Sequence, residues 1–241
     1  MKRINAFRLT AFTLVLHILA VGCTKKENEH NVLSAEEKAQ GWTLLFDGKT
    51  LDNWHVYNKG KQASEWSAFE GEILCNPDSP DRTGDLVTDK EYENYELQFD
   101  WKLSDKGNSG VFINVVEADS LTAAWLSGPE YQLLDNNHKD YAVPTKRSGC
   151  LYSFTNQKNE VKMSGAQWNH SKVIQENGKV KFYLNDVLTS EMDFLSPEWR
   201  ELVSNSGFAR YQLFGKSTKG KIGLQDWASG VSFRNIKIRE L

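Results

Sequence analysis

One segment of the chain alternates strictly between apolar and polar side chains. From Tyr95 to Leu103 the odd positions are all apolar or aromatic, and the even positions are Glu, Gln, Asp and Lys. Because successive side chains of an extended chain point to opposite sides, this period of two predicts a strand with one buried and one hydrated face. The chain is therefore expected to build a sheet that covers a core, and Trp101 belongs to that core.

Further short strands are predicted between turn residues. Val111–Val116 is expected to be a more deeply buried strand, and Lys172–Gln175 is joined to Lys179–Leu184 by Asn177-Gly178. Asn-Gly favours the positive backbone angles of a type I′ turn, so this segment is predicted to be a β-hairpin. The last two expected strands are Lys221–Gln225 and Val231–Ile238.

Helical signals are few and short. Ser34 and Glu37 form a capping box around Ala35–Gln40, and Ser196 followed by Pro197 marks the start of a second short helix. The chain shows no strand–helix–strand alternation, which a parallel sheet would need. Many short strands with one or two short helices predict an all-β fold, a jelly-roll sandwich whose curved sheet offers a concave face to a ligand.

The chain begins with a segment typical of an export signal. A mostly apolar run, Leu9–Val21, follows the basic residues Lys2, Arg3 and Arg8. The run is too short to span a bilayer comfortably. The sequence Ala-Val-Gly-Cys that ends at Cys23 resembles a bacterial lipobox, in which the chain is cut before the cysteine and the thiol receives lipid. The alternative is an ordinary signal peptide with an incidental cysteine.

This interpretation divides the chain into a lipoprotein signal peptide (1–22), a lipidated tether (23–40) and a single domain (41–241). A lipid anchor at Cys23 predicts a protein held to a membrane outside the cytoplasm. Thr24, rather than Asp, then favours the outer membrane of a Gram-negative-type bacterium, on its periplasmic side or at the cell surface. In that oxidising compartment Cys75 and Cys150 would either pair or remain as buried free thiols.

The charge balance and the motifs that are missing narrow the chemistry. The 29 Lys and Arg residues nearly balance the 32 Asp and Glu residues, so no nucleic-acid partner is expected. The sequence contains no P-loop, Gly-rich dinucleotide fingerprint, Gly-x-Ser-x-Gly elbow, His-Glu-x-x-His helix or Cys-x-x-Cys pair. A serine hydrolase or a zinc enzyme with several histidine ligands is therefore disfavoured.

The segment Gly128–Asp135 carries the strongest candidate chemistry. Glu130 and Gln132 share one face of a regular strand, whereas Asp135 has the opposite parity and joins them only through a bulge or at the strand end. Carboxylates on a concave sheet are how many sugar-cleaving enzymes place an acid and a base or nucleophile. An ordinary strand with its polar face in water would show the same pattern.

Polar residues after this strand extend the candidate site. His138 lies in an expected loop, where it would either carry a proton near neutral pH or simply face solvent. Lys146, Arg147 and Tyr152 could stabilise an oxyanion or hold sugar hydroxyl groups. A surface charge pair is the equally simple alternative for the two cations.

Aromatic residues are abundant, with 8 Trp, 8 Tyr and 12 Phe. Most of them are expected in the core, because large aromatic side chains bury well. Trp125 and Trp227 are better candidates for stacking against a sugar ring, since each is flanked by small residues and loop signals.

A set of ordered motifs resembles the 3-keto-disaccharide hydrolase family (DUF1080) over roughly residues 41–241. The opening segment, an Asn-Ser-Gly strand, the central acidic strand, two weaker blocks and the last two strands match in order: Leu45–Trp54, Asn108–Phe112, Gly128–Asp135, Gly149–Tyr152, Gln167–Asn169, Gly223–Asp226 and Phe233–Ile238. The chain departs from residues common in the family at Asn114, Lys146, Cys150 and Trp227.

The resemblance implies a concanavalin A-like jelly roll, of the lectin–glucanase type, that acts on oxidised sugars outside the cytoplasm. A ketone at C3 acidifies the proton at C2. A base removes this proton, an enolate forms, and the group at C1 departs with a proton from an acid. Water then adds to the product, on this enzyme or on a second one. The reaction needs a base, an acid and a group that stabilises the enolate.

Roles can be suggested for the candidate residues on this basis. Glu130 or His138 would be the base and Tyr152 or Asp135 the acid or an orienting group, while Arg147 and Lys146 would steady the enolate. A divalent metal ion bound by Glu130, Asp135 and His138 could replace those cations. The expected substrate-binding residues are Asn108, Asn114, Trp125, Gln132, Lys146, Gln225 and Trp227.

Two other functions fit the same residues. An ordinary glycoside hydrolase with two carboxylates would cleave glycans that are not oxidised and would lose activity in Glu130→Gln. A non-catalytic surface lipoprotein that binds carbohydrate would instead depend on Trp125 and Trp227. The enzyme is favoured because a carboxylate, a histidine and cations lie between Glu130 and Tyr152, whereas a binding protein needs only stacking and neutral hydrogen bonds.

Overall fold

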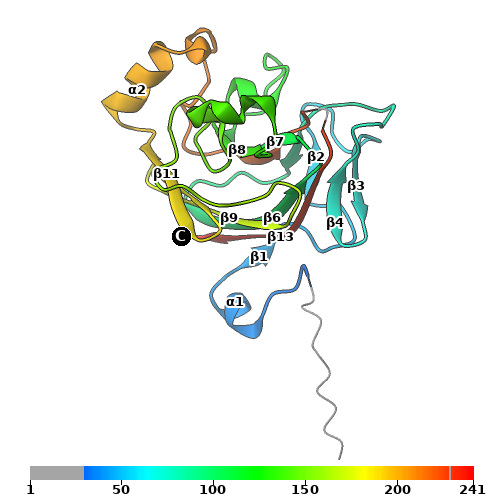
Figure 1. The fold of residues 1–241 in the computed structure, drawn as a ribbon. Coiled ribbons are helices and arrows are strands. Elements are labelled where there is room, and N and C mark those ends of the chain that lie inside the picture. Colours follow the sequence, from blue (N-terminus) through cyan, green and yellow to red (C-terminus); the bar gives the residue numbers. More distant parts are fainter. Residues whose placement is uncertain (1–29, 228) are drawn as a thin grey trace, which may run out of the picture.

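The computed structural model describes residues 30–241 except residue 228, and these residues form two antiparallel sheets (Figure 1). The expected leader and the lipidated Cys23 lie outside the described residues. Within the described part, each helix is too short or too polar to cross a bilayer.

The larger sheet has eight strands in the order β11-β10-β9-β6-β13-β4-β3, and β1 also pairs with β13. β6 lies in the middle of this sheet, between two strands from the second half of the chain. The strands are β1 (Thr43–Leu44), β3 (Trp66–Phe69), β4 (Glu72–Cys75), β6 (Tyr95–Leu103), β9 (Asn169–Glu176), β10 (Lys179–Leu184), β11 (Val187–Asp193) and β13 (Val231–Glu240).

The smaller sheet has five strands in the order β2-β5-β12-β7-β8. Its members are β2 (Trp54–Val56), β5 (Leu86–Thr88), β7 (Asn108–Val115), β8 (Glu130–Leu134) and β12 (Lys221–Leu224). Because β12 inserts between β5 and β7, segments far apart in the sequence become neighbours here. Antiparallel pairing between such distant strands is the arrangement of a jelly-roll sandwich, which confirms the predicted fold class.

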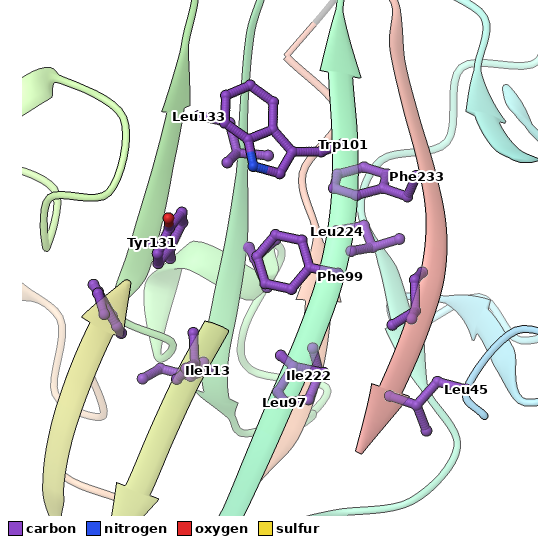
Figure 2. Close-up of a cluster of buried hydrophobic side chains, with 14 of the residues drawn as sticks. Leu45, Leu97, Phe99, Trp101, Ile113, Tyr131, Leu133, Ile222, Leu224 and Phe233 are labelled. Atoms are coloured by element: carbon purple, nitrogen blue, oxygen red, sulfur yellow. The ribbon is translucent and has the colours of Figure 1, made fainter. Parts of the chain in front are cut away.

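The core lies between the two sheets (Figure 2). Burial along β6 alternates residue by residue, as predicted, and Trp101 is fully buried. The indole Nε1 of Trp101 donates to Ser171 Oγ at 2.8 Å, which satisfies its only polar atom. Across the sandwich, the rings of Phe99 and Tyr131 meet edge to face with centroids 5.7 Å apart. On β8, therefore, Tyr131 faces the core while its neighbours Glu130 and Gln132 point the other way.

The local signals are largely confirmed. Ser34 caps α1 (Ala35–Ala39) with the predicted capping box, and Ser196 caps α2 (Pro197–Ser204). In the predicted hairpin Asn177 and Gly178 have φ angles of 50° and 78°. The strand expected from Val111 starts earlier, because Asn108–Gly110 also pair with β8 although they are polar or small.

From Asn31 onward, the segment before the domain packs onto the large sheet. Asn31 and Asn235 exchange two hydrogen bonds between backbone amides and side-chain oxygens, at 2.7 and 2.8 Å. Glu37 of α1 also forms an ion pair with Lys237. In Figure 1 this segment lies on the opposite side of the large sheet from the loops around β7 and β8.

The two described cysteines do not pair. Cys75 and Cys150 are both buried free thiols. Burial raises the pKa of Cys150 to about 12 and that of Cys75 further, so neither thiol is ionised near neutral pH.

Candidate functional site

A cavity of about 400 Å³ lies against the face of the small sheet that is turned away from the core. Four parts of that sheet meet there: the residue before β5, the first residues of β7 and β8, and the residues after β12. Loop residues close the sides. The lining residues are Gly84, Asp85, Asn108, Ala123, Trp125, Glu130, Gln132, Tyr152, Phe208, Gln225, Asp226 and Trp227.

Glu130, the first residue of β8, projects across β7 toward Gly110. A Cβ atom at Gly110 would lie 2.2 Å from Glu130 Oε1, so any other residue at Gly110 would displace the carboxyl group. The glycine of the Asn-Ser-Gly segment is therefore required for space. It allows the carboxyl group to lie directly on the backbone of the neighbouring strand.

The environment of Glu130 favours its protonated form. Burial of its carboxyl group raises the pKa well above the ordinary 4.5, and the nearby charge of Asp85 raises it further. A hydrogen bond with the side chain of Gln225 acts in the opposite direction but is the weaker influence. Glu130 is thus a carboxylic acid that gives up its proton less readily than an ordinary glutamic acid.

Asp85 is the second carboxyl group of the cavity, and the sequence analysis did not identify it. It is 8% exposed and precedes β5, and its Oδ1 accepts a hydrogen bond from the backbone N–H of Asp226 at 3.1 Å. Burial raises the pKa of Asp85 to about 7, although backbone hydrogen bonds from Asp226 and Ala124 oppose the shift. The only local signal is a polar residue between Gly84 and an apolar run, which is common at the start of a strand.

Charged neighbours hold the loop that carries Asp85. Buried Glu65 accepts hydrogen bonds from the backbone N–H groups of Thr83 and Gly84, both at 2.8 Å. Arg82 forms an ion pair with Asp226 at 2.5 Å. Through this ion pair the guanidinium group of Arg82 holds the loop in place. The described residues that line the cavity include no Lys, Arg or His.

Amide side chains lie beside the carboxyl pair. Gln132 Nε2 donates to Asn108 Oδ1 at 2.8 Å, across the β7–β8 pair. Gln225 contacts Glu130 and is fixed through its backbone, whose N–H donates to the carbonyl of Gly110 at 2.9 Å. These amides offer neutral donors and acceptors to a ligand, which is the usual way a protein binds hydroxyl and carbonyl groups.

Aromatic side chains form the rim. Trp125 packs edge-on against Tyr211, with ring centroids 5.0 Å apart, and Phe208 stacks on Phe214 at 4.2 Å. Trp227 is 58% exposed, a large value for tryptophan. Trp125 and Phe208 are therefore held rigidly by other rings, whereas Trp227 presents much of its surface to an entering ligand.

The structure brings seven of the predicted site residues to the cavity: Asn108, Trp125, Glu130, Gln132, Tyr152, Gln225 and Trp227. Tyr152 is held there through its backbone, because its N–H donates to the carbonyl oxygen of Glu130 at 3.0 Å.

Asp135 and His138 do not line the cavity. Asp135 is buried after the end of β8, where its Oδ1 accepts the backbone N–H of Asn137 at 2.9 Å and builds the turn. His138 caps the 3₁₀ turn that follows, since its Nδ1 accepts the backbone N–H of Asp140 at 3.1 Å. Both residues shape the turn that ends the strand.

The predicted cations and Asn114 also point elsewhere. Lys146 forms an ion pair with Asp140 at 3.0 Å, and Arg147 donates to the backbone carbonyl of Tyr141 at 3.1 Å. Asn114 has a φ of 56°, which turns its side chain toward Gln175 of the opposite sheet at 2.7 Å. Enolate stabilisation by Lys146 and Arg147 therefore has no support in this geometry.

The described residues contain no group of three or more His, Cys, Asp and Glu side chains arranged to hold a metal ion. The ligand set suggested from the sequence does not converge, because Asp135 and His138 lie outside the cavity that holds Glu130. With the residues present, the cavity can supply an acid, a base, amide donors and aromatic surfaces.

The part of the chain that matches known proteins includes all of the residues that line the cavity. Residues 41–239 match a family model described as a 3-keto-alpha-glucoside-1,2-lyase-like domain. A protein of Bacteroides thetaiotaomicron named 3-keto-disaccharide hydrolase is 30% identical over 90% of this chain and 84% of its own length.

Solved structures show the same fold. A candidate glycosyl hydrolase from Parabacteroides distasonis has a TM-score of 0.81 and 32% identity, covering 88% of this chain and 100% of that chain. A second candidate glycosyl hydrolase from the same organism has a TM-score of 0.61 and 28% identity, covering 83% and 99%. The similarity thus extends over nearly all of the described residues.

Proposed function

The chain belongs to the 3-keto-alpha-glucoside-1,2-lyase-like family of glycosidic-bond-cleaving enzymes, and from this premise we propose that it cleaves 3-keto-glycosides, including 3-keto-disaccharides, in the cavity described above. The observation that carries the proposal is the pair of buried carboxyl groups, Asp85 and Glu130, in one cavity. Burial in a cavity without a cation among its described lining residues gives both groups raised pKa values, which suits proton transfer near neutral pH.

In the proposed reaction Asp85 is the base. The C3 ketone acidifies the C2–H bond, Asp85 takes this proton, and the electron pair moves into the enolate. The bond between C1 and the glycosidic oxygen then breaks as Glu130 gives its proton to the leaving oxygen. Addition of water reverses both transfers: Glu130 takes a proton from water as oxygen bonds to C1, and Asp85 returns its proton to C2. Both groups end as they began.

The way in which Asp85 and Glu130 influence each other supports this order of roles. With a pKa of about 7, Asp85 is ionised in a substantial fraction of molecules near neutral pH. Its charge is one cause of the raised pKa of Glu130, so ionisation of the base helps the acid to keep its proton. We assign stabilisation of the enolate to the amide groups of Asn108 and Gln225, because both line the cavity and neutral donors are the available ones.

A second candidate function rests on the same pair. Two carboxyl groups in one cavity are also the machinery of an ordinary glycoside hydrolase. We would incubate the domain with matched glycosides and 3-keto-glycosides and follow release of the leaving group. Release from the 3-keto compounds alone, with deuterium from solvent incorporated at C2, supports the proposed reaction. Release from the unoxidised glycosides supports the two-carboxylate hydrolase instead.

Absence of release from every compound, together with retention on a glycan column, would support the non-catalytic binding protein. In that case retention should fall in Trp125→Ala and Trp227→Ala and change little in Glu130→Gln. This outcome would contradict the proposed enzymatic function.

We also propose that lipid attached at Cys23 anchors the protein to the outer membrane. The described chain emerges on the side of the large sheet opposite the loops around β7 and β8, so an anchor there would leave the cavity accessible (Figure 1). Expression in a lipoprotein-processing host with labelled palmitate tests this. Label should enter the wild type and be lost in Cys23→Ser, while equal labelling of the two would contradict the anchor.

A further inference from the structure

Gln132 lines the cavity and has one side-chain polar atom without a partner among the described residues. The residue is 1% exposed and lies two positions after Glu130 on the same face of β8. Its Nε2 donates to Asn108 Oδ1 at 2.8 Å, but within the part of the chain that the structure describes its buried Oε1 has no hydrogen-bond partner. An unpaired buried acceptor costs free energy, so a protein seldom keeps one unless something that enters the site pairs with it.

The orientation of this amide follows from its surroundings. Nε2 lies between Asn108 Oδ1 and, at 3.5 Å, the backbone carbonyl oxygen of Leu133. Exchanging the oxygen and nitrogen atoms of Gln132 would place two acceptors against each other at Leu133. The atom that remains for a ligand is therefore the oxygen, which accepts hydrogen bonds and cannot donate them.

We propose that Gln132 is a specificity-determining residue whose Oε1 accepts a hydrogen bond from a hydroxyl group on the sugar ring that carries the ketone. The inference rests on the proposed function and adds which part of the substrate is recognised and by what. A ketone, an ether oxygen or a methylene group has no proton to donate. Such a group at this position would leave Oε1 unpaired in the complex.

The spacing along β8 identifies the ring. Side chains two residues apart on one face of a strand are about 7 Å apart, which is comparable to the width of one pyranose ring with its hydroxyl groups. When Glu130 contacts the glycosidic oxygen at one edge, Gln132 reaches the far edge of the same ring. The hydroxyl groups there are those at C4 and C6, and we assign the contact to one of these two.

The test compares kcat/KM for an aryl 3-keto-glucoside with its 4-deoxy and 6-deoxy analogues. The wild type should discriminate against one analogue by about tenfold to a hundredfold. In Gln132→Met, which keeps the length but not the acceptor, that preference should shrink to within about threefold. Gln98→Met is the matched control, because Gln98 lies on the other sheet and bonds to Glu96, and it should keep the full preference.

Fluorinated analogues test the direction of the hydrogen bond in the wild type itself, whether or not a variant folds. Fluorine at the recognised position cannot donate, so this analogue should be cleaved as poorly as the deoxy compound. Efficient cleavage of the fluoro analogue would overturn the inference, as would an undiminished preference in folded Gln132→Met. If the wild type cleaves no 3-keto-glycoside at all, the proposed function fails and the inference fails with it.

Discussion

Two clusters of carboxyl groups lie at the two ends of β5, and their environments act on them in opposite directions. Asp85, before the strand, shares its cavity with Glu130, and both have raised pKa values. Asp89, after the strand, lies with Glu117 around His55, whose Nδ1 and Nε2 are 2.6 and 2.9 Å from the two carboxylates. There the hydrogen bonds to His55 contribute to lowered pKa values of Asp89 and Glu117.

The difference between the clusters is the presence of a cation. Both ring nitrogens of His55 lie within hydrogen-bond distance of carboxylate oxygens. Lys221 places a positive charge 3.5 Å from Glu117. The Asp85–Glu130 pair is buried in a cavity whose described lining residues include no cation. A single short strand thus separates carboxylates that hold the fold from carboxyl groups that are poised to exchange protons.

Exchanging a carboxyl group for an amide in each cluster should give the largest difference in kcat between two variants. Glu130→Gln keeps the shape but removes the proposed acid, so we expect kcat to fall about 10³-fold. The matched variant is Glu117→Gln, which should leave kcat within about threefold while lowering the melting temperature. Initial rates with an aryl 3-keto-glucoside and thermal unfolding measure both. Equal losses of kcat in the two variants would contradict the assignment of the active site.

The pH dependence should follow Asp85. A base with a pKa of about 7 must lose its proton to act, so kcat/KM of the wild type should fall about tenfold per pH unit below that value. At higher pH the rate should decline again as Glu130 ionises. Asp85→Asn should be strongly impaired, and its residual rate should not show the acidic limb. A variant that retains this limb would show that another group is the base.

The sequence was sufficient to predict most of the fold and part of the site, and the reason is locality. The alternation along Tyr95–Leu103 and the Asn177-Gly178 turn are local properties, and both were confirmed. The parity that places Glu130 and Gln132 on one face is equally local. The packing of α1 onto the large sheet was not predicted, because its partner, Lys237, comes from the other end of the chain.

Asp85 could not be predicted because its neighbours come from distant parts of the chain. Asp85 and Glu130 line one cavity because β12 pairs with both β5 and β7 and so joins the strand after Asp85 to the part of the sheet that carries Glu130. His138, in contrast, is close to Glu130 along the sequence, yet the turn after β8 directs it to the backbone of Asp140. Nearness along the chain therefore says little about a site that several strands build together.

The free energy of unfolding should show that the buried carboxyl group of Asp85 destabilises the folded state when it is ionised. The folded state binds the proton of Asp85 more tightly than the unfolded state, so its stability falls as pH rises from the ordinary pKa of 3.8 to about 7. Asp85→Asn removes this penalty and should raise the free energy of unfolding by about 1–3 kcal/mol at pH 8. The gain should disappear below pH 4. Urea unfolding at both pH values measures it, and a loss at pH 8 would contradict the prediction.

In the cluster around His55, stability should change with pH in the opposite direction. Because the folded-state pKa values of Asp89 and Glu117 are lowered, their contribution to stability is present above their ordinary values and is lost as pH falls through the lowered ones. His55→Ala should therefore cost about 1–2 kcal/mol at pH 6 and less near pH 3. His170→Ala is the control, because among the described residues His170 pairs with a single carboxylate, Asp100, and is more exposed. It should cost less than His55→Ala at pH 6.

The smallest effect is expected at the rim of the cavity, where the comparison becomes one of rigid and exposed aromatic residues. Trp227 is 58% exposed, so its removal leaves little core unfilled, and stability should change by less than about 0.5 kcal/mol. Trp227→Ala should raise KM about threefold to tenfold through lost stacking, with kcat unchanged. Phe208→Ala is the contrasting variant, since Phe208 stacks on Phe214 and its loss should lower stability as well. If Trp227→Ala instead lowers kcat and leaves KM unchanged, the indole acts in the transition state, and the separation between an aromatic rim and a carboxyl pair at the centre would have to be abandoned.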